Sequence, residues 1–259
     1  MELIPSWLYI LIAAVIGLEF GGLATIFIQR WIDEKPILTP GRSRCPCCEE
    51  KLDWCDTIPV LSYFLLKGRC RHCDASIGGQ YLLVELSCLA WSLALLDLHG
   101  PSLAWGVHFV LGCMLIAGSF IDFETFLLPD RITLGGTGLA LAASLFLETP
   151  GWQGALLGAV AGALIFWIIE RYYTWRNKFG IGLGDVKLMC MIGAMVGISG
   201  LPLTILLTGL ASYIALGAMA LKSGREVFAK AIPYGPFLSL GCMLYILYGE
   251  QIMRWWNGV

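Results

Sequence analysis

Runs of apolar residues long enough to cross a lipid bilayer recur along almost the whole chain. A membrane helix needs about twenty mainly apolar residues, because the hydrocarbon core is about 30 Å thick and each residue advances about 1.5 Å. Of the 259 residues, 58% are hydrophobic and only 14% are charged, and the mean hydropathy of +0.75 lies far outside the soluble range. These features predict an all-α polytopic membrane protein.

The apolar runs predict eight transmembrane helices. They lie near residues 7–28, 81–98, 103–121, 132–147, 154–169, 186–198, 201–221 and 237–248. The first run has no basic residue before it and no small-residue cleavage site, so we expect it to be a retained span. Three regions follow from this pattern: a first helix in 1–30, a separate water-exposed domain in 31–80, and a membrane region in 81–259 that carries seven further helices.

The positions of lysine and arginine predict an orientation. Loops on the cytoplasmic side of membrane helices are enriched in these residues. With the amino terminus outside and eight spans, all 17 basic residues except Arg254 fall on the cytoplasmic side. The polar segment 31–80 is therefore expected to be cytoplasmic.

Four cysteines of the polar segment form two C-x-x-C pairs, namely Cys45 with Cys48 and Cys70 with Cys73. A reducing compartment disfavours disulfides, and this spacing favours tetrahedral zinc. We therefore predict a small zinc-ribbon-like insertion, whose metal would stabilise a segment that has few apolar residues. Reduced thiols without a metal are the alternative, and Cys47 or Cys55 could replace one of the four ligands.

Two aspartates lie where predicted helices meet the cytoplasmic face. Asp122 follows the third apolar run, and Asp185 opens the sixth run after Gly182-Leu183-Gly184. Two complete spans separate them, so both are expected at the same face. An acid within a span costs about 2.5–3.5 kcal/mol on insertion scales and therefore usually faces the bundle interior and has a role. The structural alternative for Asp185 is a helix N-cap.

Two carboxylates brought together share one proton and can act as base and acid. In aspartic protease chemistry, one carboxylate takes a proton from the water that attacks the scissile carbonyl, and the protonated partner polarises the carbonyl oxygen. The chain has no G-x-S-x-G sequence and no paired His and Cys within its spans, so no competing nucleophile is evident. These residues predict an aspartic endopeptidase.

Other charged residues have both functional and structural explanations. Glu19 and Glu85 lie inside spans and are candidate substrate contacts, or packing acids paired with an arginine. Lys187 could pair with the neighbouring aspartate or a substrate carboxylate, or simply flank the cytoplasmic end of a helix. Asp130 has the position of an N-cap for the fourth span, and Glu124 is expected in an exposed loop.

Several motifs, in order, resemble the type IV prepilin leader peptidases, which are bacterial inner-membrane aspartic peptidases of the G-x-G-D class. The second aspartate motif of that family is similar to Gly182–Leu188, and the first is similar to Ile121-Asp122 with Leu128-Pro129-Asp130. Further similarity covers Cys45–Cys73, Val84-Glu85 and Ile232–Phe237. The resemblance extends along nearly the whole chain.

The resemblance implies removal of the short basic leader of type IV prepilins and pseudopilins at the cytoplasmic face of the inner membrane, with a periplasmic amino terminus. It implies that Asp122 and Asp185 are catalytic. The residues of the supporting motif are Gly182, Gly184 and Lys187. Many family members also methylate the new amino terminus with S-adenosylmethionine. The expected partners are prepilin substrates and membrane lipid, without nucleic acid, and the oligomeric state is left open.

Other classes of function share some of these features. A proton- or ion-coupled transporter would also place acids in the membrane, but the two halves of the chain show no internal repeat. A secretion-assembly scaffold would use the cysteine segment and leave the aspartates dispensable. The presenilin-like G-x-G-D proteases are disfavoured because the chain has no Pro-Ala-Leu triplet.

Overall fold

The computed structural model describes residues 5–36, 44–45, 47–176, 180–223 and 232–258. These residues are mainly helical, and outside the helices the described part of the chain forms only isolated β-bridges in the cysteine segment. The chain divides into two compact units, Met1–Ala117 and Gly118–Val259, called unit 1 and unit 2 below. The prediction of an all-α fold is confirmed.

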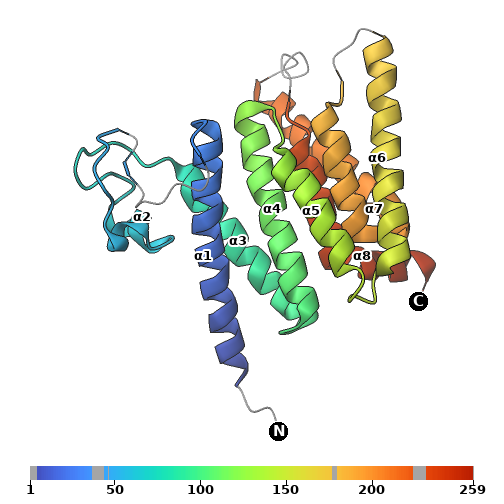
Figure 1. The fold of residues 1–259 in the computed structure, drawn as a ribbon, viewed down its shortest axis with the longest axis horizontal. Coiled ribbons are helices and arrows are strands. Elements are labelled where there is room, and N and C mark those ends of the chain that lie inside the picture. Colours follow the sequence, from blue (N-terminus) through green and yellow to red (C-terminus); the bar gives the residue numbers. More distant parts are fainter. Residues whose placement is uncertain (1–4, 37–43, 46, 177–179, 224–231, 259) are drawn as a thin grey trace. The chain divides into compact units, whose positions relative to one another are not determined.

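The helices follow the predicted spans closely (Figure 1). Unit 1 contains α1 (Ser6–Ile32), the 3-10 helix η1 (Trp54–Thr57), α2 (Leu61–Leu65), α3 (Gly79–His99) and the first part of α4 (Leu103–Thr125). Unit 2 contains the end of α4, α5 (Asp130–Ala143), α6 (Gly151–Trp175), α7 (Leu183–Ser223) and α8 (Gly235–Asn257).

Five of these helices are long and apolar enough to cross a membrane, namely α1, α3, α4, α6 and α7. Helix α7 contains two of the predicted spans, and α5 and α8 occupy the other two. All eight predicted segments thus coincide with helices in the described part of the chain, although the fourth, predicted to residue 147, ends at Ala143. The protein is a polytopic membrane protein.

Unit 1 is built on the packing of α1 against α3. A Cβ atom on Gly21 of α1 would lie 2.7 Å from Cα of Glu85 in α3, so the missing side chain allows the two helices to approach closely. The hydroxyl of Ser92, which is buried on α3, donates a hydrogen bond of 2.7 Å to the carbonyl of Ala13. The indole of Trp105 at the start of α4 donates to the Ser92 carbonyl at 3.0 Å.

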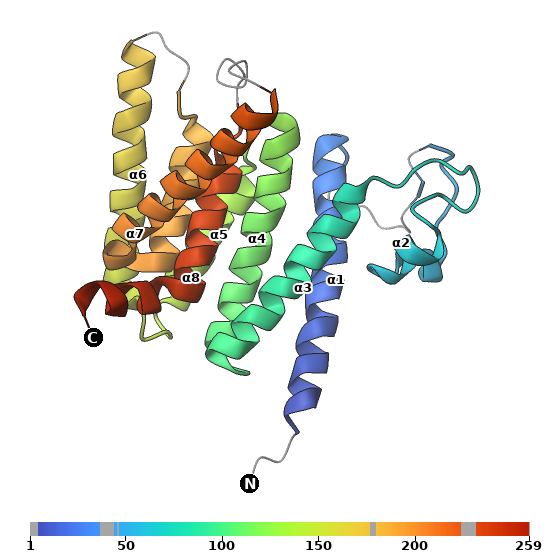
Figure 2. The ribbon, with the colours of Figure 1, turned by 180° about the vertical axis from the view of Figure 1, so that it is seen from behind.

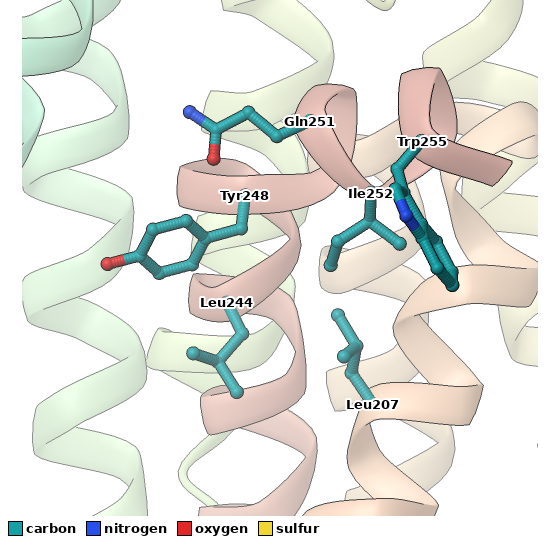
Figure 3. A pocket seen from close by; sticks show the side chains of 6 residues that line it. All are labelled: Leu207, Leu244, Tyr248, Gln251, Ile252 and Trp255. Carbon is teal, nitrogen blue, oxygen red and sulfur yellow. The ribbon is translucent and has the colours of Figure 1, made fainter. Parts of the chain in front are cut away.

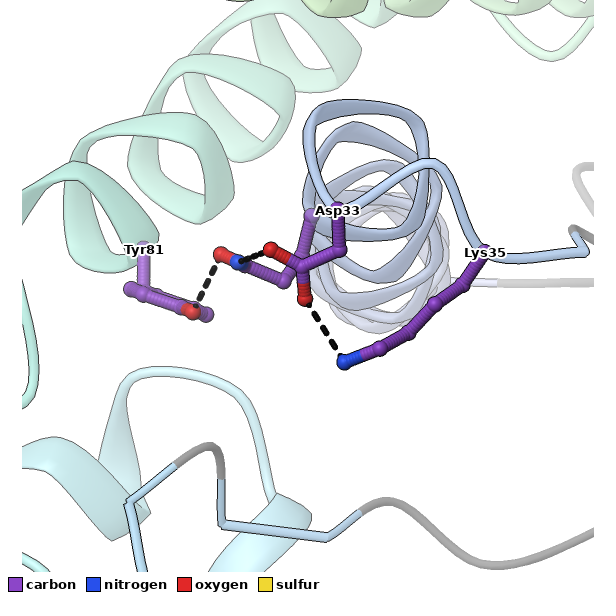
Figure 4. A network of polar contacts seen from close by, with 4 residues as sticks. Asp33, Lys35 and Tyr81 are labelled. Carbon is purple, nitrogen blue, oxygen red and sulfur yellow. Dashed lines mark hydrogen bonds and ion pairs between the residues drawn. The ribbon is translucent and has the colours of Figure 1, made fainter.

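A polar network joins the two ends of the cysteine segment, where α1 ends and α3 begins (Figure 4). Tyr81 donates its hydroxyl to the Gln29 side-chain oxygen at 2.7 Å, and the Gln29 amide donates to Asp33 at 3.0 Å. Lys35 forms an ion pair with Asp33 at 3.0 Å. These contacts hold the end of α1, where the cysteine segment begins, next to the start of α3, where the segment ends.

Helix α7 contacts α5, α6 and α8 and so forms the centre of unit 2 (Figures 1 and 2). Its helical geometry is broken at Gly197, which has φ 72° and ψ 173°, a conformation that favours glycine. The break lies just before the Ser199-Gly200 separation expected from the sequence. On the first half of α7, the backbone of Gly193 approaches that of Gly158 in α6 so closely that neither position has room for a side chain.

Contacts between the helices show that four helix ends meet at one end of unit 2. Lys187 and Met191 of α7 contact Asp130 and Gly136 of α5 in the same order, so α5 and the first half of α7 run in the same direction. The backbone of Gly235, where α8 begins, contacts the Asp122 side chain near the end of α4. The end of α4 and the starts of α5, α7 and α8 are thereby brought together.

Candidate functional site

Asp122 lies one turn before the end of α4 and is 5% exposed. The backbone N–H of Gly235 donates a hydrogen bond of 3.0 Å to its Oδ2 atom. A Cβ atom on Gly235 would lie 2.7 Å from that oxygen, so only glycine allows this approach without a shift. Gly235 belongs to the Ile232–Phe237 sequence, but it was not among the predicted site residues.

Asp185 is the third residue of α7 and is half-buried. Its Oδ2 atom accepts a hydrogen bond of 3.1 Å from the backbone N–H of Gly182. The carbonyl of Gly182 in turn accepts the backbone N–H groups of Asp185 and Val186. Gly182 is therefore the N-cap residue, and Asp185 caps the helix from its first turn, as an acidic residue does in a capping box.

The two aspartates lie close enough at this end of unit 2 for their carboxylates to interact electrostatically. Each carboxylate has its Oδ2 atom held by a backbone N–H group, and neither Oδ1 atom has a hydrogen bond to a described residue. The side chain of Leu128 lies against Gly184 on one side and Gly118 of α4 on the other. One oxygen of each carboxylate is therefore held in place by a backbone N–H group.

Lys187 forms an ion pair of 2.6 Å with Asp130, and not with the neighbouring Asp185. Asp130 is the first residue of α5, and Pro129 is the N-cap. The expectation that Asp130 caps this helix is therefore wrong, although an acid in the first turn still interacts favourably with the helix dipole. Glu124 is exposed, as predicted, but it lies in the last turn of α4 and not in a loop.

The two acids predicted as substrate contacts both lie in unit 1. Glu85 is half-buried on α3, and its carboxylate accepts the backbone N–H of Val60 at 2.6 Å. Glu19 is exposed on α1. The structural alternative for Glu85 was an ion pair with an arginine, but the partner found is the backbone N–H of Val60.

The four predicted metal ligands are brought together. The sulfur atoms of Cys45, Cys48, Cys70 and Cys73 all lie within 4.8 Å of one another. Cys47 and Cys55 do not belong to this cluster in the part of the chain that is described. Four thiol groups at these separations could hold one metal ion.

The two knuckles have the same backbone geometry. The N–H of Cys45 donates to Glu50 and the Cys45 carbonyl accepts the N–H of Glu49, and Cys70 makes the same pair of bonds with Ala75 and Asp74. Glu49 and Asp74, each directly after the second cysteine, have φ angles of 58° and 60°. Neither turn has a glycine at this position.

The knuckles favour the thiolate form at the first cysteine of each pair, whereas burial and the neighbouring thiols raise the pKa of Cys48 and raise that of Cys73 to about 12. The backbone N–H groups of Cys48 and Cys47 lower the pKa of Cys45 to about 6. Those of Cys73 and His72 likewise lower the pKa of Cys70. Ionised thiols are the form that binds metal ions.

A hollow of about 410 Å³ lies between α7 and α8 (Figure 3). It is lined by Leu207, Leu244, Tyr248, Gln251, Ile252 and Trp255. Even its nearest residue on α8, Leu244, is about 13 Å along the helix from Gly235. No carboxylate or imidazole lines it. The hollow is therefore not part of the candidate catalytic site.

Two protein-family models, both of the same peptidase family, match the chain. A model of the bacterial peptidase A24 N-terminal domain matches residues 15–97, and a model of the type IV leader peptidase family matches residues 109–217. No solved structure matches the chain.

Three similar curated proteins share the description prepilin leader peptidase/N-methyltransferase. The protein of Burkholderia pseudomallei (strain K96243) is 34% identical, over 95% of this chain and 87% of the relative. That of Aeromonas hydrophila is 32% identical over 96% and 94%, and that of Stutzerimonas stutzeri is 34% identical over 94% and 92%. Two family models cover most of the chain and these relatives align along nearly all of it, so the chain belongs to the type IV leader peptidase family.

Proposed function

We propose that this protein is a membrane aspartic endopeptidase that removes the short basic leader of type IV prepilins and pseudopilins, with Asp122 and Asp185 as its catalytic pair. The observation that carries the proposal is the matched setting of the two carboxylates. Both lie at one end of unit 2, and each has one oxygen held by a backbone N–H and the other without a hydrogen bond to a described residue. The names of the relatives support the substrate class.

The proposed reaction needs one proton shared between the two carboxylates. The ionised aspartate takes a proton from a water, whose oxygen then bonds to the scissile carbonyl carbon, while the protonated aspartate gives its proton to the carbonyl oxygen. When the tetrahedral intermediate collapses, the carbon–nitrogen bond breaks, the leaving amine takes the proton that the first aspartate received from water, and the other aspartate takes a proton from a hydroxyl of the intermediate, which restores the starting pair. The N–H groups of Gly182 and Gly235 would hold both carboxylates in position throughout, which limits reorganisation.

The proposed location is the bacterial inner membrane, with the amino terminus in the periplasm and the aspartates at the cytoplasmic side. The distribution of basic residues supports this orientation. Prepilin leaders are themselves basic and would be cut on the cytoplasmic side, just before the apolar helix of the substrate. The aspartates, at helix ends, would meet the substrate at that boundary.

Zinc is the proposed metal of the four-cysteine cluster. Zn–S bonds are about 2.3 Å long, so a tetrahedral site has sulfur–sulfur edges of about 3.8 Å. The Cys45 and Cys73 sulfur atoms are 3.8 Å apart, and the described residues thus fit the ion. The zinc would be structural: it would hold the two knuckles together and take no part in cleavage.

Methylation of the new amino terminus by S-adenosylmethionine is a second proposed activity, and it rests on the names of the relatives. The small pocket between α1 and α3 has a volume of about 10 Å³. That space suits a single water and does not fit S-adenosylmethionine. No residue is therefore assigned to the methyl donor.

The test is cleavage by the purified protein in lipid. Wild type and Asp185→Asn would each be incubated with a full-length prepilin, and the products would be analysed by mass spectrometry. Loss of the leader with wild type alone supports the proposal, and a further gain of one methyl group with S-adenosylmethionine supports methylation. Failure of folded wild type to cleave several prepilins would favour the transporter or scaffold alternatives.

A further inference from the structure

The cysteine segment exposes a group of large apolar side chains. They are Trp54, Leu61, Phe64 and Leu65, with exposed fractions of 71%, 52%, 63% and 69%. We call these four residues on η1 and α2 the insertion patch. Exposed apolar groups gathered on so small a segment mark an interaction surface more often than a water-facing one.

Two contacts place the start of α2 beside the membrane helices. A Cβ atom on Gly22 of α1 would lie 3.3 Å from the ring of Pro59, so this proline packs directly on α1. The N–H of the next residue, Val60, donates to Glu85 on α3 at 2.6 Å. Gly22 lies about 15 Å before the end of α1 at Ile32. The patch therefore begins alongside α1 and α3, well inside both helices.

The views agree with this placement. Figures 1 and 2 both draw α2 next to the middle of α1, and not beyond the end at which α1 leads into the cysteine segment. At the same level α1 presents its own exposed apolar side chains, among them Leu23 at 60% and Ile26 at 39%. The insertion patch thus continues an apolar surface that belongs to a membrane-spanning helix.

The backbone before α2 is held in an unusual conformation. Val60 has φ 63° and ψ −51°, and the N–H of Leu61 donates to the carbonyl of Pro59 at 2.6 Å. This is a γ-turn of the rare kind, centred on a β-branched residue. The bond to Glu85 keeps the turn closed, and the turn determines where α2 starts.

Charged residues follow the patch directly. Lys67 is exposed, and Arg69 is exposed and lies 3.7 Å from Asp74. Long basic side chains next to an apolar surface can reach lipid phosphates while their stems stay in the apolar layer. A cytoplasmic protein partner would not require this order of apolar and basic residues beside a spanning helix.

We propose that the insertion patch enters the lipid bilayer beside α1 and anchors the cysteine segment to the membrane surface. Trp54, Leu61, Phe64 and Leu65 contact acyl chains at the interface, and Lys67 and Arg69 contact anionic headgroups. The anchor fixes the four-cysteine cluster at a constant height next to the membrane. This inference depends only on the membrane-spanning character of α1 and α3, and not on the proposed peptidase activity.

Site-specific photo-crosslinking tests the anchor in the full-length protein. Phe64 would be replaced by p-benzoylphenylalanine, which is close to it in shape, and the protein placed in nanodiscs of phosphatidylethanolamine and phosphatidylglycerol. The same label at Leu23 provides a comparison on α1, and at the exposed Glu50, in the first cysteine knuckle, a comparison on the same segment. A second patch label at Leu65 guards against a local effect at one position.

After irradiation, mass spectrometry of the labelled peptides distinguishes the outcomes. Phospholipid adducts at positions 64 and 65 with yields close to that at position 23, and clearly above that at position 50, support the anchor. Lipid adducts at 64 and 65 no more abundant than at 50 overturn it. Adducts mainly to a second copy of the chain, or to an added prepilin, overturn it in favour of a protein-binding surface.

Discussion

Replacement of Gly235 by alanine is expected to damage the candidate site without removing either aspartate. The new Cβ would lie 2.7 Å from Oδ2 of Asp122 and 3.2 Å from its Cγ. Ordinary contacts begin at 3.4 Å, so the carboxylate or the start of α8 must move by about 0.7 Å. The bond from the Gly235 N–H would be lost or distorted, and hydrogen bonds to charged groups contribute about 1.5–3 kcal/mol. We expect kcat to fall about 10- to 150-fold.

The assay is steady-state cleavage of a prepilin by the variant in lipid. We expect the loss in kcat with little change in KM, because the substitution displaces a reacting group and leaves the surface around it intact. Gly138→Ala in α5 is a matched control, since a Cβ at that position meets nothing within 4 Å. Wild-type kcat for a folded Gly235→Ala variant would refute the idea that this backbone contact positions Asp122.

Three further predictions concern the surroundings of the site and the cysteine segment. Lys187→Gln removes the ion pair with Asp130. Both side chains are more than a third exposed, so the free energy of unfolding should fall by less than about 1 kcal/mol. A loss of several kcal/mol in denaturant titrations would contradict this prediction. Glu85→Ala should lower the free energy of unfolding by about 1–3 kcal/mol, because the partly buried N–H of Val60 loses its acceptor. Glu85→Gln should keep most of the wild-type stability, and equal losses of thermal stability in the two variants would contradict the role of this acceptor. The N–H groups of its knuckle lower the pKa of Cys45 from 9.0 to about 6. The contribution of its thiolate to the stability of the knuckle is therefore complete above about pH 9 and is lost as the pH falls through 6. Metal release, followed with a chromogenic chelator, should rise as the pH falls through that range, and release already complete at pH 8 would contradict the assignment.

Much of the fold follows from the apolar runs, because the thickness of a bilayer fixes how long each helix must be. The number of runs between Asp122 and Asp185 predicts that they share a face, and the structure places both at one end of unit 2. The spacing of the cysteines likewise brings four sulfur atoms together. In each case the constraint is local or periodic, so it can be read without knowledge of the tertiary contacts.

The details that were not predictable depend on distant contacts or on backbone angles. The partner of Lys187 is 57 residues away, and the role of Gly235 depends on a contact across 113 residues. The break in α7 falls at Gly197, although the nearby Gly200 was an equally good signal in the sequence. Val60 and Glu49 adopt positive φ angles that residues of their type seldom show; the bond to Glu85 holds Val60 there, and bonds to Cys45 and Arg44 hold Glu49.

The proposed catalytic pair is tested most directly by comparing prepilin cleavage for Asp122→Asn, Asp185→Asn and Asp130→Asn. Asparagine keeps the size and an acceptor oxygen of aspartate but cannot share the proton. We predict that the first two variants fold and lose cleavage, while Asp130→Asn, whose residue contacts Lys187 at the surface, retains much of it. Cleavage at the wild-type rate by either Asp122→Asn or Asp185→Asn would contradict the proposed mechanism.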